Sequence, residues 1–193
     1  MQTLVGVKGQ DKKQTARKIT VRIAYTALFT AIGVLFNVYT INPTKSLAIS
    51  FISIPALLAG IMLGPISGFA VGILSDLIGC IIAPHGPFMI MLSISAGLFG
   101  FIPGVIFLIF RMHPHLKIAI SYFLTFVLCT CFMNTFDLWI TYNKGKTSFW
   151  LYLLPRLPWQ LINSVINWIL ATLLFVALRR AKIIKIPKKV KAN

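Results

Sequence analysis

The sequence predicts an all-α membrane protein, a bundle of six transmembrane helices with both ends of the chain in the cytoplasm. Of the 193 residues, 58% are hydrophobic, whereas soluble domains contain about 45–50% apolar residues. The apolar residues form six runs, most of them near or above the ~18 residues that a helix needs to cross a hydrocarbon core of ~30 Å. Only 11% of the residues are charged, and these gather at the chain ends and between the runs.

Turn-forming residues separate the six runs, so that each run is expected to form one helix. Asn42-Pro43, Gly64-Pro65 and the segment Pro84–Pro87 separate the first four runs. Pro114 and the segment Asn143–Lys146 separate the last three. The second and third runs are short, and we expect their helices to be tilted or partly interrupted. The expected helices are Ile19–Tyr39, Leu47–Leu63, Ile66–Ala83, Phe88–Phe110, Ile118–Tyr142 and Phe149–Leu178.

The uneven distribution of lysine and arginine predicts the orientation of the chain, because these residues are enriched in cytoplasmic loops. With the N-terminus inside, six basic residues at the N-terminal end, two after the fourth run and seven in the tail are cytoplasmic, against four outside. An odd number of helices would place the basic tail outside. We therefore expect a basic cytoplasmic arm over residues 1–18, a membrane domain over 19–178 and a basic cytoplasmic tail over 179–193, with an uncleaved first helix.

The composition excludes several other classes of protein. The net charge of +16 does not predict nucleic-acid binding, because topology and anionic lipid headgroups account for basic residues beside apolar runs. Cys80, Cys129 and Cys131 lie within apolar runs and are odd in number, so neither disulfides nor a metal site are expected. The sequence lacks a phosphate-binding G-x-x-x-x-G-K-[ST] loop and the common hydrolase motifs. We expect no enzymatic activity and no cofactor, and any uphill transport would take its energy from a partner.

Polar residues inside the fifth and sixth runs form one stripe on each helix. Residues at i, i+4, i+7 and i+11 share a helix face, and a charge within a bilayer costs at least about 2.5–3.5 kcal/mol, which makes such residues functional candidates. Since the fifth helix leads outward and the sixth returns, both stripes are expected in the outer half, lining a cavity with aromatic walls that suit a flat ligand. The stripes are Thr130, Asn134, Asp137 and Thr141 in the fifth run, and Arg156, Gln160, Asn163 and Asn167 in the sixth.

The substrate-binding candidates come from these stripes and from their surroundings. Two alternatives remain: the amides form hydrogen bonds between helices without a ligand, or Arg156 and Asp137 form an ion pair with each other. The outer aromatic residues also suit an interfacial belt. For Asp76, near the outer mouth, a hydrogen-bonded structural role is favoured over ligand contact. The candidates are Asn134, Asp137, Arg156, Gln160, Asn163, His85 and Trp139.

Small residues at helical spacing predict close helix packing. Gly64, Gly68 and Gly72, and likewise Ala96, Gly100 and Gly104, are expected to pack helices inside this chain. Ala24, Ala27 and Ala31 in the first run form a third set, which suits the approach of another helix.

The order of several motifs resembles that of a known family. Ser50–Pro55, Leu63-Gly64-Pro65, Ser75–Gly79, Pro84–Phe88 and Ser95–Gly100 follow one another. Together they resemble the substrate-binding S components of energy-coupling factor (ECF) vitamin transporters, over about residues 19–178. Asn134-Thr135, Asn143–Lys146 and Leu154–Leu157 look most like the folate-type branch.

The resemblance implies a function and partners. It implies a six-helix S-component fold in the cell membrane of a prokaryote, binding a vitamin, folate above all, near the outer surface through Asn134, Arg156 and Gln160. It also implies a transmembrane coupling subunit, which docks on Ala27 and Ala31, and two ATPase subunits. The alternatives are an S component for riboflavin, pantothenate or a pterin relative, a membrane scaffold without a ligand, and a self-contained secondary transporter.

Overall fold

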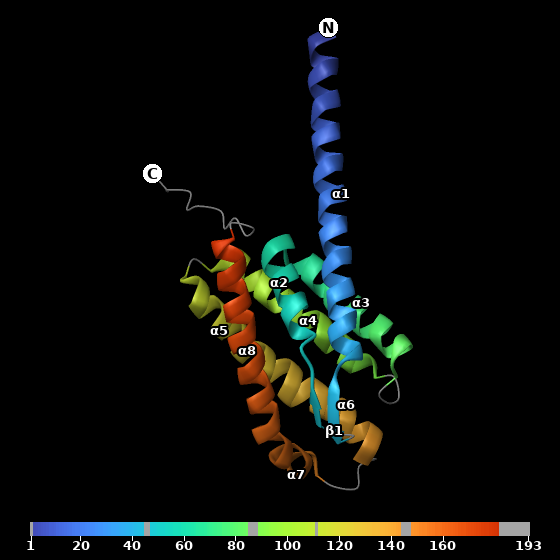
Figure 1. The fold of residues 1–193 in the computed structure, drawn as a ribbon, viewed down its shortest axis with the longest axis vertical. Coiled ribbons are helices and arrows are strands. Elements are labelled where there is room, and N and C mark those ends of the chain that lie inside the picture. The colour runs from blue at the N-terminus through green and yellow to red at the C-terminus, as the bar shows by residue number, and fades with distance from the viewer. Residues whose placement is uncertain (1, 45–46, 85–88, 111, 144–147, 182–193) are drawn as a thin grey trace.

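The computed structural model describes residues 2–44, 47–84, 89–110, 112–143 and 148–181, and in this part the chain is almost entirely helical (Figure 1). Four helices form the first half of the described bundle, and two long helical rods form the second half. The elements are α1 (Gln2–Val38), β1 (Ile41–Thr44), β2 (Leu47–Ile49), α2 (Ser53–Leu63), α3 (Pro65–Ile82), α4 (Ile90–Ile109), α5 (Pro114–Thr125), the π-helical η1 (Phe126–Asn134), α6 (Thr135–Leu138), the π-helical η2 (Trp139–Asn143), α7 (Phe149–Leu153), the 3₁₀-helical η3 (Leu154–Arg156) and α8 (Leu157–Arg180).

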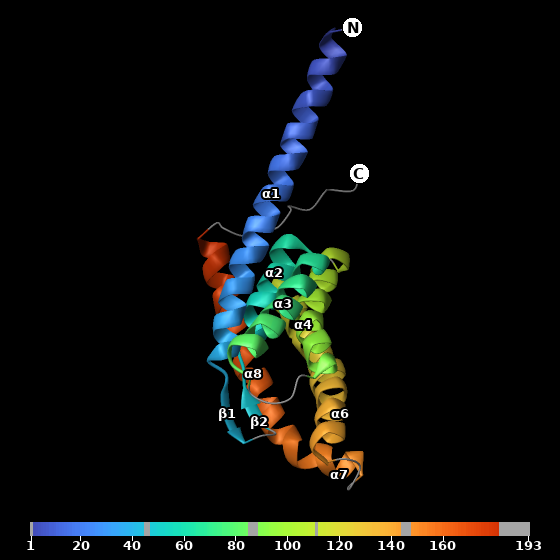
Figure 2. The ribbon, with the colours of Figure 1, turned by 90° about the vertical axis from the view of Figure 1, so that its right-hand side faces the viewer.

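Five of the described helices are long and apolar enough to cross a membrane. They are Gln14–Val38 of α1, then α3, α4, the first rod (Pro114–Tyr142, 29 residues) and the second rod (Phe149–Arg180, 32 residues). In both views α8 ends at the same end of the bundle from which α1 extends (Figures 1 and 2). The opposite end, which carries β1, β2 and α7, is called the hairpin end below.

The expected second helix, Leu47–Leu63, is wrong in its first part. Leu47–Ile49 is strand β2, which pairs antiparallel with β1, and the helix begins only at Ser53. A short apolar run does not distinguish a strand from a helix by its periodicity, which is why the sequence pattern merged the two. With 11 residues at 1.5 Å per residue, α2 is about 16 Å long, roughly half of the hydrocarbon thickness.

The short helix α2 lies in the centre of the bundle. All of its residues from Ser53 to Gly60 are buried. Its apolar side chains Ile54, Leu57 and Leu58 join a core cluster that extends to the first rod and to Phe175 of α8. The core of the molecule is therefore assembled around α2, although this helix is too short to cross a membrane alone.

Glycine residues allow α2, α3 and α4 to approach one another at the level of their backbones. A Cβ atom added at Gly68 would lie 2.6 Å from both the Gly60 Cα and the Gly100 carbonyl oxygen. A Cβ at Gly104 would lie 2.6 Å from the Pro65 Cα, and one at Gly72 would lie 2.8 Å from the Gly97 Cα. Real side chains essentially never show such distances, so this glycine seam confirms the predicted internal packing of the two small-residue rows.

Helix α1 is attached to the turn between α2 and α3 by one arginine. Arg22 Nε donates to Ser67 Oγ at 3.1 Å, and its Nη2 donates to the carbonyl oxygen of Leu63. The turn contains Gly64 at φ 99°, a left-handed conformation that glycine adopts without steric cost. Further along, Asn37 of α1 packs against Gly79 of α3.

Candidate functional site

A hydrogen bond joins the two rods. It links Gln160, from the predicted polar stripe of α8, to Thr135, the residue after Asn134 on the first rod. Gln160 Nε2 donates to Thr135 Oγ1 at 3.3 Å. Gln160 is 7% exposed and Thr135 is fully buried. Because Asn134 directly precedes Thr135 and Arg156 lies one helical turn before Gln160, the structure brings these three candidates close together toward the hairpin end.

Several buried polar atoms in this region have no hydrogen-bond partner among the described residues. They comprise two acceptors, Asn134 Oδ1 and Gln160 Oε1, and three donors, Arg156 Nε, Arg156 Nη1 and Trp159 Nε1. We call these atoms the polar cluster. A buried polar group without a partner costs about 1–3 kcal/mol, and native proteins contain few of them. Five on adjacent turns of two facing helices are therefore typical of a binding site without its ligand.

The guanidinium of Arg156 combines burial with an aromatic neighbour. The side chain is 8% exposed, and its Cζ lies 5.2 Å from the centre of the Tyr152 ring, in a cation–π arrangement. A guanidinium offers five donors in a planar fork that matches carboxylate and carbonyl oxygens. With Nε and Nη1 unpaired, Arg156 can bind an oxygen-rich group of a ligand.

Asp137 has a different partner from the one the sequence suggested. Its Oδ2 accepts a hydrogen bond from the backbone N–H of Leu92 at 3.3 Å. Leu92 lies in the first turn of α4, whose free N–H groups and dipole favour a negative charge. In the described part of the chain no ion pair joins Asp137 to Arg156, so the carboxylate fixes the first rod to the beginning of α4.

The far end of the α8 stripe links helices to each other. Asn167 is 3% exposed and its Nδ2 donates to the Ser50 carbonyl oxygen at 3.0 Å and to Asn163 Oδ1 at 3.1 Å. Asn167 Oδ1 accepts from Ser53 Oγ at 3.1 Å. Asn167 therefore makes the hydrogen bonds between segments that the alternative expected, whereas the described hydrogen bonds of Asn163 stay within α8.

A buried carboxylate, that of Asp76, connects the first half of the bundle. Asp76 of α3 accepts from Asn37 Nδ2 at 3.1 Å and from Ser93 Oγ at 2.6 Å, and the residue is 7% exposed. It thereby joins α1, α3 and α4. This confirms the hydrogen-bonded structural role that the sequence favoured for Asp76.

Aromatic rings gather beside the polar cluster, where the two rods approach the loop between them. The Trp139 ring centre lies 6.1 Å from that of Phe136 and 6.3 Å from that of Phe149. Phe149 also contacts Trp150, at 5.8 Å. Rings of this kind provide flat apolar surfaces for a ring-shaped ligand. His85 lies outside the described residues.

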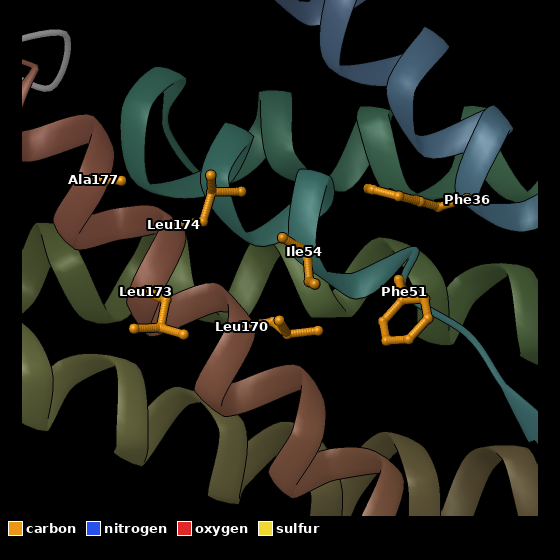
Figure 3. A pocket seen from close by; sticks show the side chains of 7 residues that line it. All are labelled: Phe36, Phe51, Ile54, Leu170, Leu173, Leu174 and Ala177. Carbon is orange, nitrogen blue, oxygen red and sulfur yellow. The ribbon is translucent and has the colours of Figure 1, made fainter.

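An apolar groove of about 560 Å³ lies elsewhere, between α1, α2 and α8 (Figure 3). No residue of the polar cluster lines it, and its lining lacks the polar groups that orient a vitamin-like ligand. The lining residues are Phe36, Phe51, Ile54, Leu170, Leu173, Leu174 and Ala177.

Comparison with known families decides the class of protein. Residues 21–175 match the family model of the ECF transporter, substrate-specific component. The chain belongs to this family. As a substrate-specific (S) component it is a membrane protein, and its family is the substrate-binding part of a transporter. The resemblance that the sequence motifs indicated is confirmed.

Individual relatives agree with the family. The folate transporter FolT of Clostridium novyi is 28% identical over 130 residues, which cover 67% of this chain and 73% of the relative. An uncharacterized protein of Mycoplasma pneumoniae is 31% identical over 84 residues, which cover 44% of this chain but only 29% of that relative's length.

Solved structures show the same fold. FolT bound with folic acid superposes with a TM-score of 0.67 at 23% identity, covering 79% of this chain and 90% of FolT. The S component of a bacterial ECF transporter superposes with a TM-score of 0.59 at 17% identity, covering 83% of this chain and 96% of the other. The S-component fold expected from the sequence is therefore confirmed.

The predicted docking residues of this S component lie apart from the polar cluster. Ala24, Ala27 and Ala31 are exposed on α1, while Thr30 and Asn37 of the same helix are buried. The three alanines thus form a strip of small side chains on the outside of the bundle, which the described chain does not cover.

Thr135 and Trp159 lie at the polar cluster but were not among the candidates. Thr135 lies one residue after Asn134, about 100° away from the stripe in an ideal α-helix. It follows η1, however, where the wider i→i+5 geometry changes which residues share a face. Trp159 lies one residue before Gln160 and outside the polar stripe of α8, although its indole N–H is one of the unpaired donors.

Proposed function

We propose that this S component binds folate near the outer surface of a prokaryotic cell membrane and delivers it for ATP-driven uptake. The observation that carries the proposal is the polar cluster, a mixture of buried donors and acceptors beside aromatic rings. The proposal is supported by the Clostridium novyi folate transporter and by the folate-bound FolT structure as relatives. The ATP would be hydrolysed by two ATPase subunits, which act through a transmembrane coupling subunit.

The polar cluster suits both ends of a folate molecule. The pterin ring presents N–H donors along one edge, for which Asn134 Oδ1 and Gln160 Oε1 are suitable acceptors. Arg156 is suited to an oxygen-rich group, either the ring carbonyl or a carboxylate, because charge-assisted pairs are the stronger hydrogen bonds. We assign Trp139 to the wall of the site, and Asn163 and Asp137 to its supporting layer, while His85, the remaining candidate, lies outside the described residues.

We further propose that the chain crosses the membrane six times, with both termini in the cytoplasm. The positions of the ends of α1 and α8 at one end of the bundle support this topology, as does the excess of basic residues in the arm, residues 1–18, and in the tail, residues 179–193. The hairpin and the short helix α2 together would form the second crossing. The hairpin end, with the polar cluster nearby, then faces outside.

Ligand analysis provides the test. The protein is purified in mild detergent, and the molecules released on denaturation are identified by mass spectrometry. Apo protein is then titrated calorimetrically with folic acid, riboflavin and pantothenate. We expect folate to be released and to bind at least 100-fold more tightly than the other two. Tight binding of riboflavin or pantothenate instead would reassign the substrate, and no binding of any vitamin would favour a membrane scaffold.

A further inference from the structure

The hydrogen bonds around Thr135 run in one direction. Thr135 Oγ1 donates to the carbonyl oxygen of Thr130 at 3.0 Å and accepts from Gln160 Nε2 at 3.3 Å. A hydroxyl group has a single hydrogen, and here it is used by Thr130. Toward Gln160, therefore, Thr135 can act only as an acceptor. The NH₂ group of Gln160 has to face Thr135, and the carbonyl oxygen of the same amide has to point away from it.

The π-helical segment η1 makes this arrangement possible. Several threonine hydroxyls in the described α-helices bond to the carbonyl four residues earlier, as those of Thr26, Thr30 and Thr125 do. Thr135 bonds five residues back instead, to Thr130. That spacing matches the i→i+5 geometry of a π-helix, and it places the fully buried hydroxyl of Thr135 within reach of α8.

We propose that Thr135 is a positioning residue that fixes the Gln160 amide, so that Gln160 offers its oxygen, and not its NH₂ group, to the ligand. Gln160 Oε1 is buried and has no partner in the described part of the chain, so it is available to an N–H donor on the ring edge of the substrate. A ring with an acceptor at that position would face another acceptor and be rejected, which is an effective source of specificity. This inference rests on the proposed function for the identity of the ligand only.

Two substitutions of Thr135 separate its hydroxyl from its shape. Thr135→Val keeps the volume and removes the hydroxyl, whereas Thr135→Ser keeps the hydroxyl. The folic acid affinity of each full-length variant is measured by calorimetry in detergent. We expect Thr135→Val to bind at least about fivefold more weakly than the wild type, and Thr135→Ser to lose less than about twofold in affinity. In a Gln160→Leu background, valine should have no further effect. Equal losses for valine and serine, or an undiminished valine effect in that background, would overturn the inference.

A measurement without ligand tests the orientation itself. The chain contains four glutamines, Gln2, Gln10, Gln14 and Gln160, so protein labelled with ¹⁵N at the glutamine side-chain amides gives four pairs of NH₂ signals. The pair that disappears in Gln160→Leu belongs to Gln160. We expect a slowly exchanging Gln160 signal that persists in Thr135→Ser and is shifted and faster to exchange in Thr135→Val. If Thr135→Val does not fold, Thr135→Ala is used in its place.

The two measurements distinguish the inference from the proposed function. An unchanged Gln160 signal in Thr135→Val would overturn the inference even if the wild type binds folate. If the Gln160 signal changes in Thr135→Val but the wild-type protein does not bind folate, the inference is supported and folate is overturned as the substrate.

Discussion

Arg156 is the residue whose loss should weaken ligand binding most. It is 8% exposed, and its Nε and Nη1 atoms have no hydrogen-bond partner among the described residues. Its charge is therefore largely separated from water, with the Tyr152 ring beside it. A ligand oxygen that met these donors would form a charge-assisted, desolvated pair. Breaking such a pair by truncating one partner costs about 2–5 kcal/mol.

Arg156→Ala should therefore weaken folate binding by more than tenfold, as measured by calorimetry on protein that retains its helical circular-dichroism spectrum. The matched control is Arg180→Ala, an exposed arginine in the last turn of the same rod, which should change the affinity less than twofold. Equal and small losses in both variants would mean that Arg156 has only a structural role.

Helical periodicity places Asn134, Arg156 and Gln160 on two predicted stripes, and all three contribute to the polar cluster of the candidate site. It could not separate residues that face a ligand from residues that join helices. Asp137 and Asn167 follow the same spacing, yet they bond to the first turn of α4 and to Ser50 and Ser53. That distinction depends on which neighbouring helix lies opposite each residue, and a single stripe does not contain this information.

Among the elements, helix α1 has two faces with different surroundings. One face packs on α2 and α3 through Thr30, Gly33 and Asn37. The alanine strip lies on another face and remains exposed. Small side chains allow a second helix to approach closely in a membrane, which makes this strip the proposed contact with the coupling subunit.

Ala27→Trp should block assembly with the coupling subunit and leave folate affinity within about threefold, because the indole fills the space that a partner helix needs while the polar cluster is untouched. Co-purification with a tagged coupling subunit, together with calorimetry, measures both effects. Ile32→Trp serves as the control, since Ile32 is also exposed on α1 but lies about 100° around the helix from Ala31. Loss of folate binding with an intact complex would show that the assigned face is wrong.

The last four long apolar helices were predicted within about four residues of their observed bounds, because burial in a membrane demands a length that few other structures require. The first one begins at Gln2 and not at Ile19, because a helix can continue through a polar segment that the hydropathy pattern leaves out. The element that failed was the shortest. Strand β2 and helix α2 adjoin each other in one apolar stretch, and their separation depends on the pairing of β2 with β1 and on burial of α2 by its neighbours. Neither contact can be read from local periodicity.

At the scale of the whole molecule, this S component lacks the phosphate-binding loop that ATP-driven transport requires. Reconstituted alone in liposomes, it should bind folate but should not accumulate it when ATP is supplied. Addition of the coupling subunit and the two ATPases should confer ATP-dependent accumulation of labelled folate. Sustained uphill transport by the isolated chain, driven by a proton or sodium gradient, would favour a secondary transporter instead.

The glycine seam gives the two halves of the bundle unequal resistance to local opening. Backbones that touch at Gly60, Gly68 and Gly100 leave no room for water, so the amide hydrogens of α2 and α3 should exchange with solvent only in the rarest openings. The rods near the polar cluster hold unpaired polar groups that favour water entry, so we expect them to open locally more often than the glycine seam. Hydrogen exchange should therefore be faster in residues 126–143 and 149–160 than in residues 53–79. Added folate should slow exchange in the first two segments and leave the third unchanged.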